Sequence, residues 1–127
     1  MKNNFKIGTD IVEVHRINKL IEDYNYKFFN RIFTEREVKW CLSKKSPQIH
    51  FSGRFAAKEA IKKALFGYGE DLVSFKSIEI LREINKPPYV NLSFSNSNKY
   101  SCEITISHTH EYATAVAVIF VKWKFLK

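Results

Sequence analysis

The spacing of hydrophobic and polar positions changes along the chain, and each change marks a different kind of element. Residues 7–14 are rich in β-branched side chains and predict a strand. Residues 15–23 then place apolar side chains at positions 17, 20 and 21, the spacing of one helical face. The C-terminal half returns to a strand-like pattern, and we expect strands that include residues 78–80, 89–94, 103–106 and 112–121.

Two further helices are expected in the middle of the chain, each marked by a start signal. Residues 34–37 (TERE) form a capping box, in which the threonine hydroxyl and the glutamate three residues later each satisfy a free backbone amide. Ser46-Pro47 is the second signal, because proline is favoured at the first helical position. The helix that follows should run to about residue 65 and end at the FGYG sequence of residues 66–69. Together these elements predict one α+β domain over residues 1–127.

Length and composition exclude several classes of protein. The chain has 127 residues, 45% of them hydrophobic, which is enough for a buried core and too apolar for a disordered chain. Its longest apolar run is far shorter than the roughly 20 residues that cross a bilayer, and residues 1–8 are too short for a secretory signal. Cys41 and Cys102 cannot form a disulfide framework, and we expect Cys41 to pack rather than react. We therefore expect a soluble cytoplasmic protein with reduced thiols.

The distribution of charge is the first indication of a partner. The chain has 21 Lys and Arg against 13 Asp and Glu, a formal net charge of +8. The excess lies in residues 15–63, which hold 12 basic and 5 acidic residues, whereas the rest is nearly balanced. A local positive field favours an anionic partner such as a phosphate group, a nucleic acid or an acidic protein. A solvated basic surface without a partner explains the charge equally well.

Two carboxylates are candidates for a metal site. Asp10 lies within the apolar first strand, where Asp is disfavoured and an unpaired carboxylate costs several kcal/mol. Glu59 lies in the long helix, four residues before Lys63 and on the same face. Mg²⁺ commonly takes only one or two protein carboxylates, so Asp10 and Glu59 would suffice. The simpler interpretations are a salt bridge or helix cap for Asp10 and an ordinary ion pair with Lys63 for Glu59.

Two other features carry a structural or chemical implication. The sequence SHTH at 107–110 falls between the last two predicted strands, and its hydroxyl groups, imidazoles and turn amides suit phosphate oxygens. A polar hairpin turn is the more common origin of such a sequence. Small residues in the long helix would let it approach its packing partner closely: Ala56, Ala57, Ala60 and Ala64.

Four segments stand out as a set because of their order and separation. They are IGTDIVEVHRI at 7–17, RIFTERE at 31–37, GRFAAKEA at 53–60 and ISHTHEYA at 106–113. This set resembles the holo-acyl-carrier-protein synthase family, the small 4′-phosphopantetheinyl transferases, over nearly the whole chain. GRFAAKEA is its most specific part. The resemblance implies a long central helix packed on a mainly antiparallel sheet.

The resemblance also implies a reaction and the residues that perform it. The family transfers the 4′-phosphopantetheine arm of coenzyme A to a serine of apo-acyl carrier protein, releasing adenosine 3′,5′-bisphosphate, in support of fatty acid biosynthesis. By this resemblance Asp10 and Glu59 hold Mg²⁺, and Lys63 adds positive charge at the phosphates. Glu59, or a water that it orients, is the candidate general base. Coenzyme A contacts are implied for Arg54, Lys58, Ser107, His108 and Thr109.

The same resemblance implies a partner for the basic segment. The family docks acidic carrier proteins on its first helix, which implies contacts by Arg16, Lys19, Lys27 and Arg31. It also implies a homotrimer with active sites between subunits, and neither a nucleic acid nor a membrane as partner.

The sequence departs from the family pattern at two turns. The FGYG sequence at 66–69 is one residue longer than the family's loop and has tyrosine for threonine, which puts any coenzyme A contact of that loop in doubt. At the second turn Asn85 replaces glycine, a change that we expect to be mild because asparagine tolerates left-handed backbone.

Two alternatives from other classes remain open at this point. A small basic RNA-binding domain without enzymatic activity would explain the basic segment and the many aromatic residues. It would not explain Asp10 and Glu59, which repel phosphate unless a cation lies between them. A metal-dependent phosphohydrolase would use the same two carboxylates on water. Metal-dependent binding of coenzyme A distinguishes the transferase from the RNA-binding domain.

Overall fold

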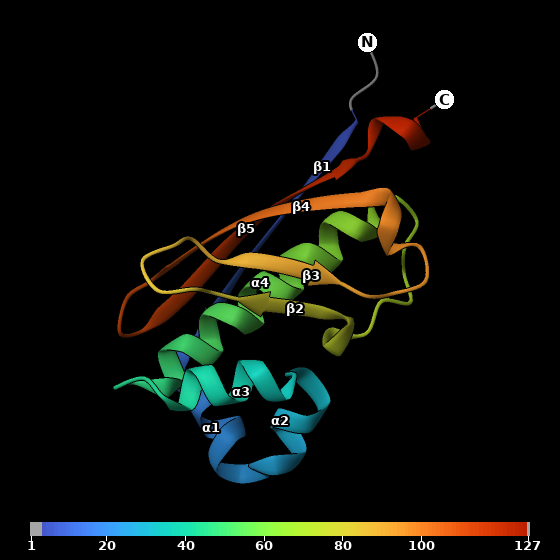
Figure 1. Cartoon of the computed structure of the whole chain (residues 1–127). Helices are drawn as coiled ribbons and strands as arrows, with labels where there is room; N and C mark the ends of the chain where they lie inside the picture. Colours follow the sequence, from blue (N-terminus) through green and yellow to red (C-terminus); the bar gives the residue numbers. More distant parts are fainter. Residues whose placement is uncertain (1–3, 127) are drawn as a thin grey trace.

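A 20-residue helix lies along one face of an antiparallel sheet, and the remaining elements are arranged around this pair (Figure 1). The computed structural model describes residues 4–126. In chain order the elements are β1 (Phe5–Glu13), α1 (Val14–Tyr24), α2 (Tyr26–Ile32), α3 (Glu35–Leu42), α4 (Pro47–Phe66), β2 (Ile78–Leu81), β3 (Tyr89–Leu92), β4 (Tyr100–His108) and β5 (Tyr112–Val121). The predicted α+β class is confirmed.

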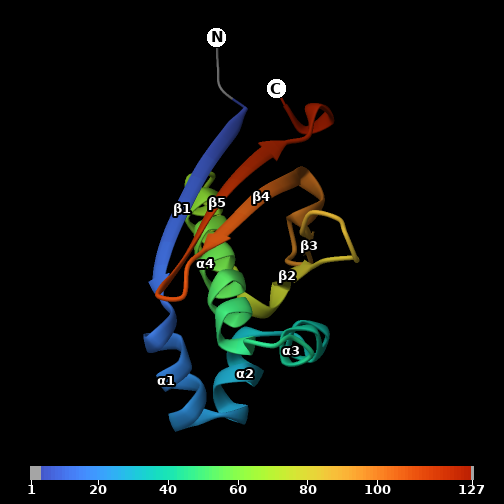
Figure 2. The same ribbon diagram turned by 90° about the vertical axis from the view of Figure 1, so that its left-hand side faces the viewer.

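The strands form two separate antiparallel sheets. In the larger sheet β5 is central and pairs with β1 on one side and β4 on the other. Figure 2 shows these three strands running side by side along α4. Asp10 of β1 lies opposite Ala115, which in turn lies opposite Ile106 of β4. β2 and β3 form a two-stranded sheet of their own. The antiparallel arrangement is as expected, but its division into two sheets was not predicted.

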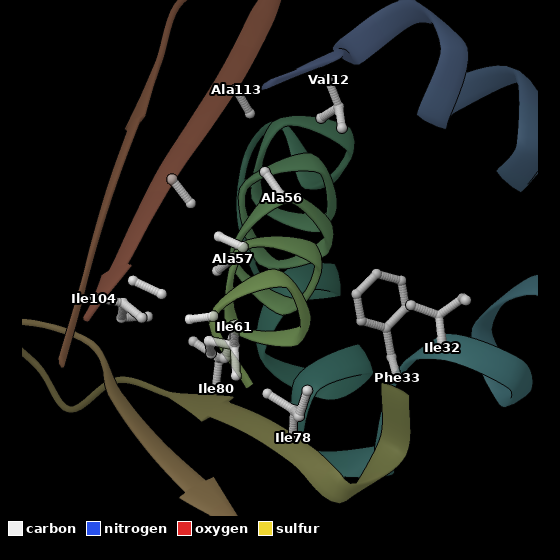
Figure 3. Packing of buried hydrophobic residues seen from close by; sticks show 14 of the residues in the cluster. Val12, Ile32, Phe33, Ala56, Ala57, Ile61, Ile78, Ile80, Ile104 and Ala113 are labelled. Carbon is white, nitrogen blue, oxygen red and sulfur yellow. The ribbon is translucent and has the colours of Figure 1, made fainter. Parts of the chain in front are cut away.

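Small residues allow α4 to lie close against the larger sheet. A Cβ atom added to Gly8 of β1 would lie 1.8 Å from the carbonyl oxygen of Ala60, and one added to Gly53 of α4 would lie 2.9 Å from Ile106 Cγ2. Figure 3 shows three alanines of the contact, Ala56, Ala57 and Ala113, between α4 and β5. All alanines of the contact are buried: Ala56, Ala57, Ala60 and Ala64 of α4, and Ala113, Ala115 and Ala117 of β5. The predicted close approach of the helix is confirmed, and it fixes β1 and β4 on either side of α4.

Both helix start signals are confirmed, and one helix was missed. Thr34 N donates to Glu37 Oε1 at 2.8 Å and Glu37 N donates to Thr34 Oγ1 at 3.3 Å, which completes the capping box before α3. The long helix α4 begins at Pro47. The missed helix is α2, which follows Asn25, a residue with a left-handed φ of 48°.

The two turns that depart from the family pattern have structural explanations. The Tyr68 hydroxyl donates to the carbonyl oxygens of Asn4, at 2.9 Å, and Ile119, at 3.1 Å, so it fastens the FGYG loop to β5 and the start of β1. Asn85 has a φ of 60°, the left-handed conformation that was expected of it.

Cys41 matches a further expectation. Cys41 is fully buried, and burial raises the pKa of its thiol to about 12, so that it packs rather than reacts. Among the helices of residues 4–126, none has both the length and the apolar character needed to cross a bilayer.

Candidate functional site

The first group of site residues gathers where β1 meets α4. Gly8 and Val12 of β1 are both buried against α4, and Asp10 lies between them on the same face because side chains alternate along a strand. Lys63 Nζ of α4 donates to Asp10 Oδ1 at 3.0 Å and to the Thr9 carbonyl oxygen at 3.0 Å. The side chain of Asp10 is only 16% exposed, so this ion pair offsets much of the cost of its burial.

Glu59 shares this side of α4 but forms no part of the ion pair. It lies one helical turn before Lys63, and no salt bridge joins the two in the described part of the chain. The interpretation of Glu59 as a partner of Lys63 is therefore wrong. Glu59 is half-buried and faces a cavity of about 380 Å³. The other residues that line this cavity are Lys62, Lys63, Phe66, Glu70, Asp71 and Val73.

The donors in this group suit a hard cation. Residues 4–126 contain no cluster of three or more His, Cys, Asp or Glu side chains that could enclose a metal. Glu59 lines the cavity, and Lys63, which also lines it, donates to Oδ1 of Asp10. Mg²⁺ fits such a set, since it binds through one or two carboxylates and completes its shell with water and phosphate oxygens.

The second group surrounds Arg54 on α4. Arg54 is 4% exposed, and its guanidinium carbon lies 3.8 Å from the centre of the Trp40 ring. Its Nε and Nη2 atoms are buried, and neither has a hydrogen-bond partner within residues 4–126. Burial lowers the pKa of this guanidinium, because the charge loses its water. Unpartnered N–H groups in a buried position are rare and costly, so this arrangement indicates an anionic ligand.

Arg54 faces a cavity of about 120 Å³. His108 lies at the end of β4, on the same face of the strand as Ile106, and reaches the same cavity. The structure therefore brings together two of the predicted coenzyme A residues. The remaining residues that line the cavity are Trp40, Ile49, His50, Gly53, Arg82, Pro88 and Ile106.

Ser107 and Thr109 flank His108 but are placed differently. Ser107 points to the opposite face of the sheet from His108, because side chains alternate along β4. Thr109 Oγ1 accepts hydrogen bonds from the backbone amides of Glu111, at 3.1 Å, and Tyr112, at 3.0 Å. Thr109 thus closes the hairpin between β4 and β5. Of the three predicted residues in this segment, only His108 reaches the Arg54 cavity.

Lys58 is part of the buried core rather than of the candidate site. Its Nζ atom donates to Glu37 Oε1 at 2.7 Å and to the carbonyl oxygens of Ile32, at 2.9 Å, and Phe75, at 3.0 Å. The side chains of Lys58 and Glu37 are both 0% exposed. All three N–H groups of the ammonium are used, so none is left for a phosphate. We therefore correct the expectation that Lys58 binds coenzyme A.

The four predicted carrier-protein contacts lie on two helices rather than one. Arg16 and Lys19 are on α1, and Lys27 and Arg31 are on α2. All four are exposed. Lys19 forms a loose, exposed ion pair of 3.7 Å with Asp23.

Sequence reasoning missed several residues around Arg54. Trp40, His50 and Arg82 line its cavity, yet no motif singled them out as site residues. For His50 a signal was present, since it lies four residues before Arg54 in the same helix and so shares a helical face with it. Trp40 and Arg82 come from α3 and from the segment after β2, and only the tertiary fold brings them here.

Comparison with known proteins identifies the class to which this chain belongs. Residues 6–117 match the family model of the 4′-phosphopantetheinyl transferase superfamily, and the chain belongs to that family. It is 44% identical over 115 residues to the holo-[acyl-carrier-protein] synthase of Protochlamydia amoebophila, covering 88% of this chain and 94% of the relative. It is 45% identical over 119 residues to that of Chlamydia caviae, covering 91% and 96%.

Solved structures agree with this assignment. The holo-(acyl-carrier-protein) synthase of Bacillus anthracis in complex with CoA (3′,5′-ADP) matches with a TM-score of 0.76 and 34% identity, covering 92% of this chain and 96% of that one. The Helicobacter pylori enzyme in complex with coenzyme A matches with a TM-score of 0.74 and 31% identity, covering 91% and 99%. The family and fold expected from the four sequence segments are confirmed.

Proposed function

We propose that this protein transfers 4′-phosphopantetheine from coenzyme A to a serine of an apo-acyl carrier protein, releasing adenosine 3′,5′-bisphosphate in support of fatty acid biosynthesis. Its relatives in Protochlamydia and Chlamydia are holo-acyl-carrier-protein synthases. The observation in the structure that carries the proposal is the buried Arg54, which has two unpartnered guanidinium nitrogens and lines a cavity together with His108. Such a site suits a phosphate of coenzyme A. A cytoplasmic location stays a prediction.

The reaction is a displacement at phosphorus, so positioning and charge neutralisation dominate. A bond forms between the serine Oγ and the phosphorus of the pantetheine arm, and the bond from that phosphorus to the bridging oxygen breaks. The leaving group departs as adenosine 3′,5′-bisphosphate. Glu59, directly or through a water that it orients, accepts the serine proton. Lys63 places positive charge near the phosphates and holds Asp10 in position.

Asp10 and Glu59 would hold Mg²⁺ in this enzyme. The cation, when bound, neutralises charge on the pyrophosphate and on the leaving phosphate. The support for this assignment is chemical: both groups are carboxylates, they lie on facing elements, and Glu59 faces a cavity.

The active site is proposed to form between subunits of a homotrimer. Asp10 lies on β1 and His108 on β4, and these strands are the two opposite edges of the larger sheet. One protomer thus presents two incomplete groups on different sides of itself. A neighbouring copy that places its β4 edge beside the β1 edge of the first would complete the site.

The outer face of the larger sheet supports this assembly. The side chains that turn away from α4 include six exposed large hydrophobic residues: Phe5, Ile7, Ile11, Tyr112, Val116 and Phe120. An exposed apolar surface across neighbouring strands is typical of a protein interface. We propose that it is covered by other copies of this chain.

The carrier protein is proposed to dock on α1 and α2. Arg16, Lys19, Lys27 and Arg31 are all exposed there, and carrier proteins are acidic. Complementary charge of this kind mainly accelerates association, and ionic strength weakens it because exposed charges are screened over about 8–10 Å.

The first test is the intact mass of an apo-acyl carrier protein after incubation with this protein, coenzyme A and Mg²⁺. We expect a gain of one phosphopantetheine group, and no gain when a chelator is present. Asp10→Ala and Glu59→Ala should each abolish the gain without changing the fold or the oligomeric state. Glu35→Ala is the matched control, because this exposed carboxylate lies on α3 outside both groups, and it should keep full activity.

Different failures of this test have different meanings. A folded and fully active Asp10→Ala protein would refute the metal assignment. No mass gain from a protein that still binds coenzyme A would mean that another carrier protein is the substrate. No gain together with no coenzyme A binding would refute the transferase, and RNA binding would then be the activity to measure.

A further inference from the structure

The Arg54 cavity contains an ionisable side chain that the proposed reaction does not use. His50 lies on the first turns of α4, on the same face as Arg54. The centre of its ring is 5.2 Å from the ring centre of Trp40 and 6.2 Å from the ring centre of His108, and both contacts are edge-on. His50 lines the cavity of Arg54 and also an adjoining cavity of about 290 Å³.

The charged and titratable side chains around His50 come from several segments of the chain. Arg54 comes from α4 itself, Lys44 from the segment before α4, Arg82 from the segment after β2, and His108 from the end of β4. Glu83 is the carboxylate among the residues of the adjoining cavity. Burial and the neighbouring cations, Arg54 foremost, lower the pKa of His50. In the free protein His50 is therefore mainly neutral at neutral pH.

The net electrostatic effect on His50 changes sign when a phosphate enters the cavity. A phosphate monoester carries nearly two negative charges at pH 7 and has three acceptor oxygens. Arg54 lines the cavity with its guanidinium carbon 3.8 Å from the centre of the Trp40 ring, and a guanidinium is suited to bind two phosphate oxygens at once. A dianion held there lies within reach of His50, and an adjacent negative charge favours the protonated form of an imidazole.

We propose that His50 takes up a proton when the phosphate monoester of coenzyme A enters the Arg54 cavity, and that it thereby selects for this phosphate. This proposal rests on the proposed function. The proton comes from solvent, so no other reactant is required. His50 is then a binding residue for the nucleotide end of coenzyme A, remote from the transferred phosphorus.

The sign of the pH dependence follows from the two states of His50. Its pKa lies below the ordinary value in the free protein. The proposal requires the adjacent phosphate to raise this pKa in the complex. The preference for coenzyme A over 3′-dephospho-coenzyme A should therefore grow as the pH falls from about 8 to about 6.5. Below about pH 6 the preference should stop growing, because the phosphate monoester itself takes up a proton.

Isothermal titration calorimetry in two buffers of different ionisation enthalpy measures this proton directly. At pH 7, with Mg²⁺ present, we expect the wild-type protein to take up about half a proton on binding coenzyme A and almost none on binding 3′-dephospho-coenzyme A. His50→Phe keeps the edge-on ring contact with Trp40 but does not titrate. It should lose the uptake and weaken coenzyme A binding about tenfold, with less than about a twofold effect on 3′-dephospho-coenzyme A.

Two further variants make the outcome decisive. His50→Gln keeps hydrogen-bonding capacity without a titration and should also lose the uptake, which excludes a packing effect of phenylalanine. His108→Gln removes the other histidine of the cavity, and at saturating coenzyme A the proton uptake per bound ligand should remain. Uptake that disappears with His108→Gln alone, or that is equal for both ligands, would overturn the proposal. If the wild-type protein binds coenzyme A without proton uptake by His50, only this inference is refuted. If it does not bind coenzyme A, the proposed function is refuted as well.

Discussion

Glu37 is a carboxylate in the core with hydrogen-bond donors around both of its oxygens. Oε1 accepts from the backbone amide of Thr34 at 2.8 Å and from Lys58 Nζ at 2.7 Å, and Oε2 accepts from the backbone amide of Ile80 at 2.8 Å. Lys58 in turn has three acceptors. Because both charges are satisfied, the pair can be buried, and it joins α3, α4 and β2.

Removing one partner of this pair should be strongly destabilising. Lys58→Met leaves the Glu37 carboxylate buried without its counter-charge, and we expect the free energy of unfolding in urea to fall by about 3–5 kcal/mol. Lys86→Met is the matched control, because Lys86 forms an exposed ion pair with Glu83 at 3.2 Å, and it should change the same quantity by less than about 1 kcal/mol. Equal losses from the two variants would show that the buried pair contributes no more to the free energy of unfolding than an exposed pair does.

Glu37 completes the capping box of α3 and also pairs with Lys58, and only the first of these contacts can be predicted from the sequence. The capping box spans only residues 34–37, so its spacing alone predicts it. The pairing of Glu37 with Lys58 joins residues 21 positions apart and depends on how α3 packs on α4. Lys58 therefore resembled a phosphate ligand from its neighbours in the sequence, although the fold buries it.

The contact between β1 and α4 positions the first group of site residues. Gly8 brings the strand so close to the helix that its Cα lies beside the backbone of Ala60. Two residues later, Asp10 meets Lys63, one turn beyond Glu59. The geometry of this group thus depends on the absence of a side chain at position 8.

Gly8→Ala should therefore disrupt the fold through a steric effect. The added Cβ would lie 1.8 Å from the Ala60 carbonyl oxygen, a backbone atom that cannot move aside, and we expect a loss of more than about 3 kcal/mol in the free energy of unfolding. Gly69→Ala separates this effect from backbone strain. Gly69 has a φ of +88° but open space around it, and its substitution should cost about 1 kcal/mol. Denaturant unfolding of both variants measures the difference, and similar losses would contradict the steric explanation.

At the scale of elements, hydrophobic spacing was sufficient for most of the fold. Together with β-branched composition and the Ser46-Pro47 start signal, it predicted β1, α1, α4 and β5 to within a few residues. It missed α2, because a helix of seven residues without a side-chain cap has too few periodic positions to be distinguished from a loop. It also missed the division of the strands into two sheets, since strand pairing is set by contacts between distant parts of the chain.

For the whole molecule, the decisive feature is the separation of the two groups of site residues. Asp10, Glu59 and Lys63 lie at the β1 side of α4, and Arg54 and His108 lie at the β4 side. Sequence motifs name the members of both groups but hold no information on which groups share a subunit. A trimer that joins unlike edges would bring one group from each of two copies into every site.

Complementation between inactive variants tests this arrangement. Asp10→Ala disables the β1-side group and Arg54→Ala disables the β4-side group, so each variant alone should be inactive. In co-expressed mixed trimers, random assembly pairs an intact β1 side with an intact β4 side in about one quarter of the sites, and about a quarter of wild-type transfer should return. Asp10→Ala mixed with Glu59→Ala is the matched control, because both changes fall in the same group and no site becomes intact. Sedimentation confirms that the mixtures are trimers. A trimeric mixture of the first pair without activity would place the complete site within one subunit.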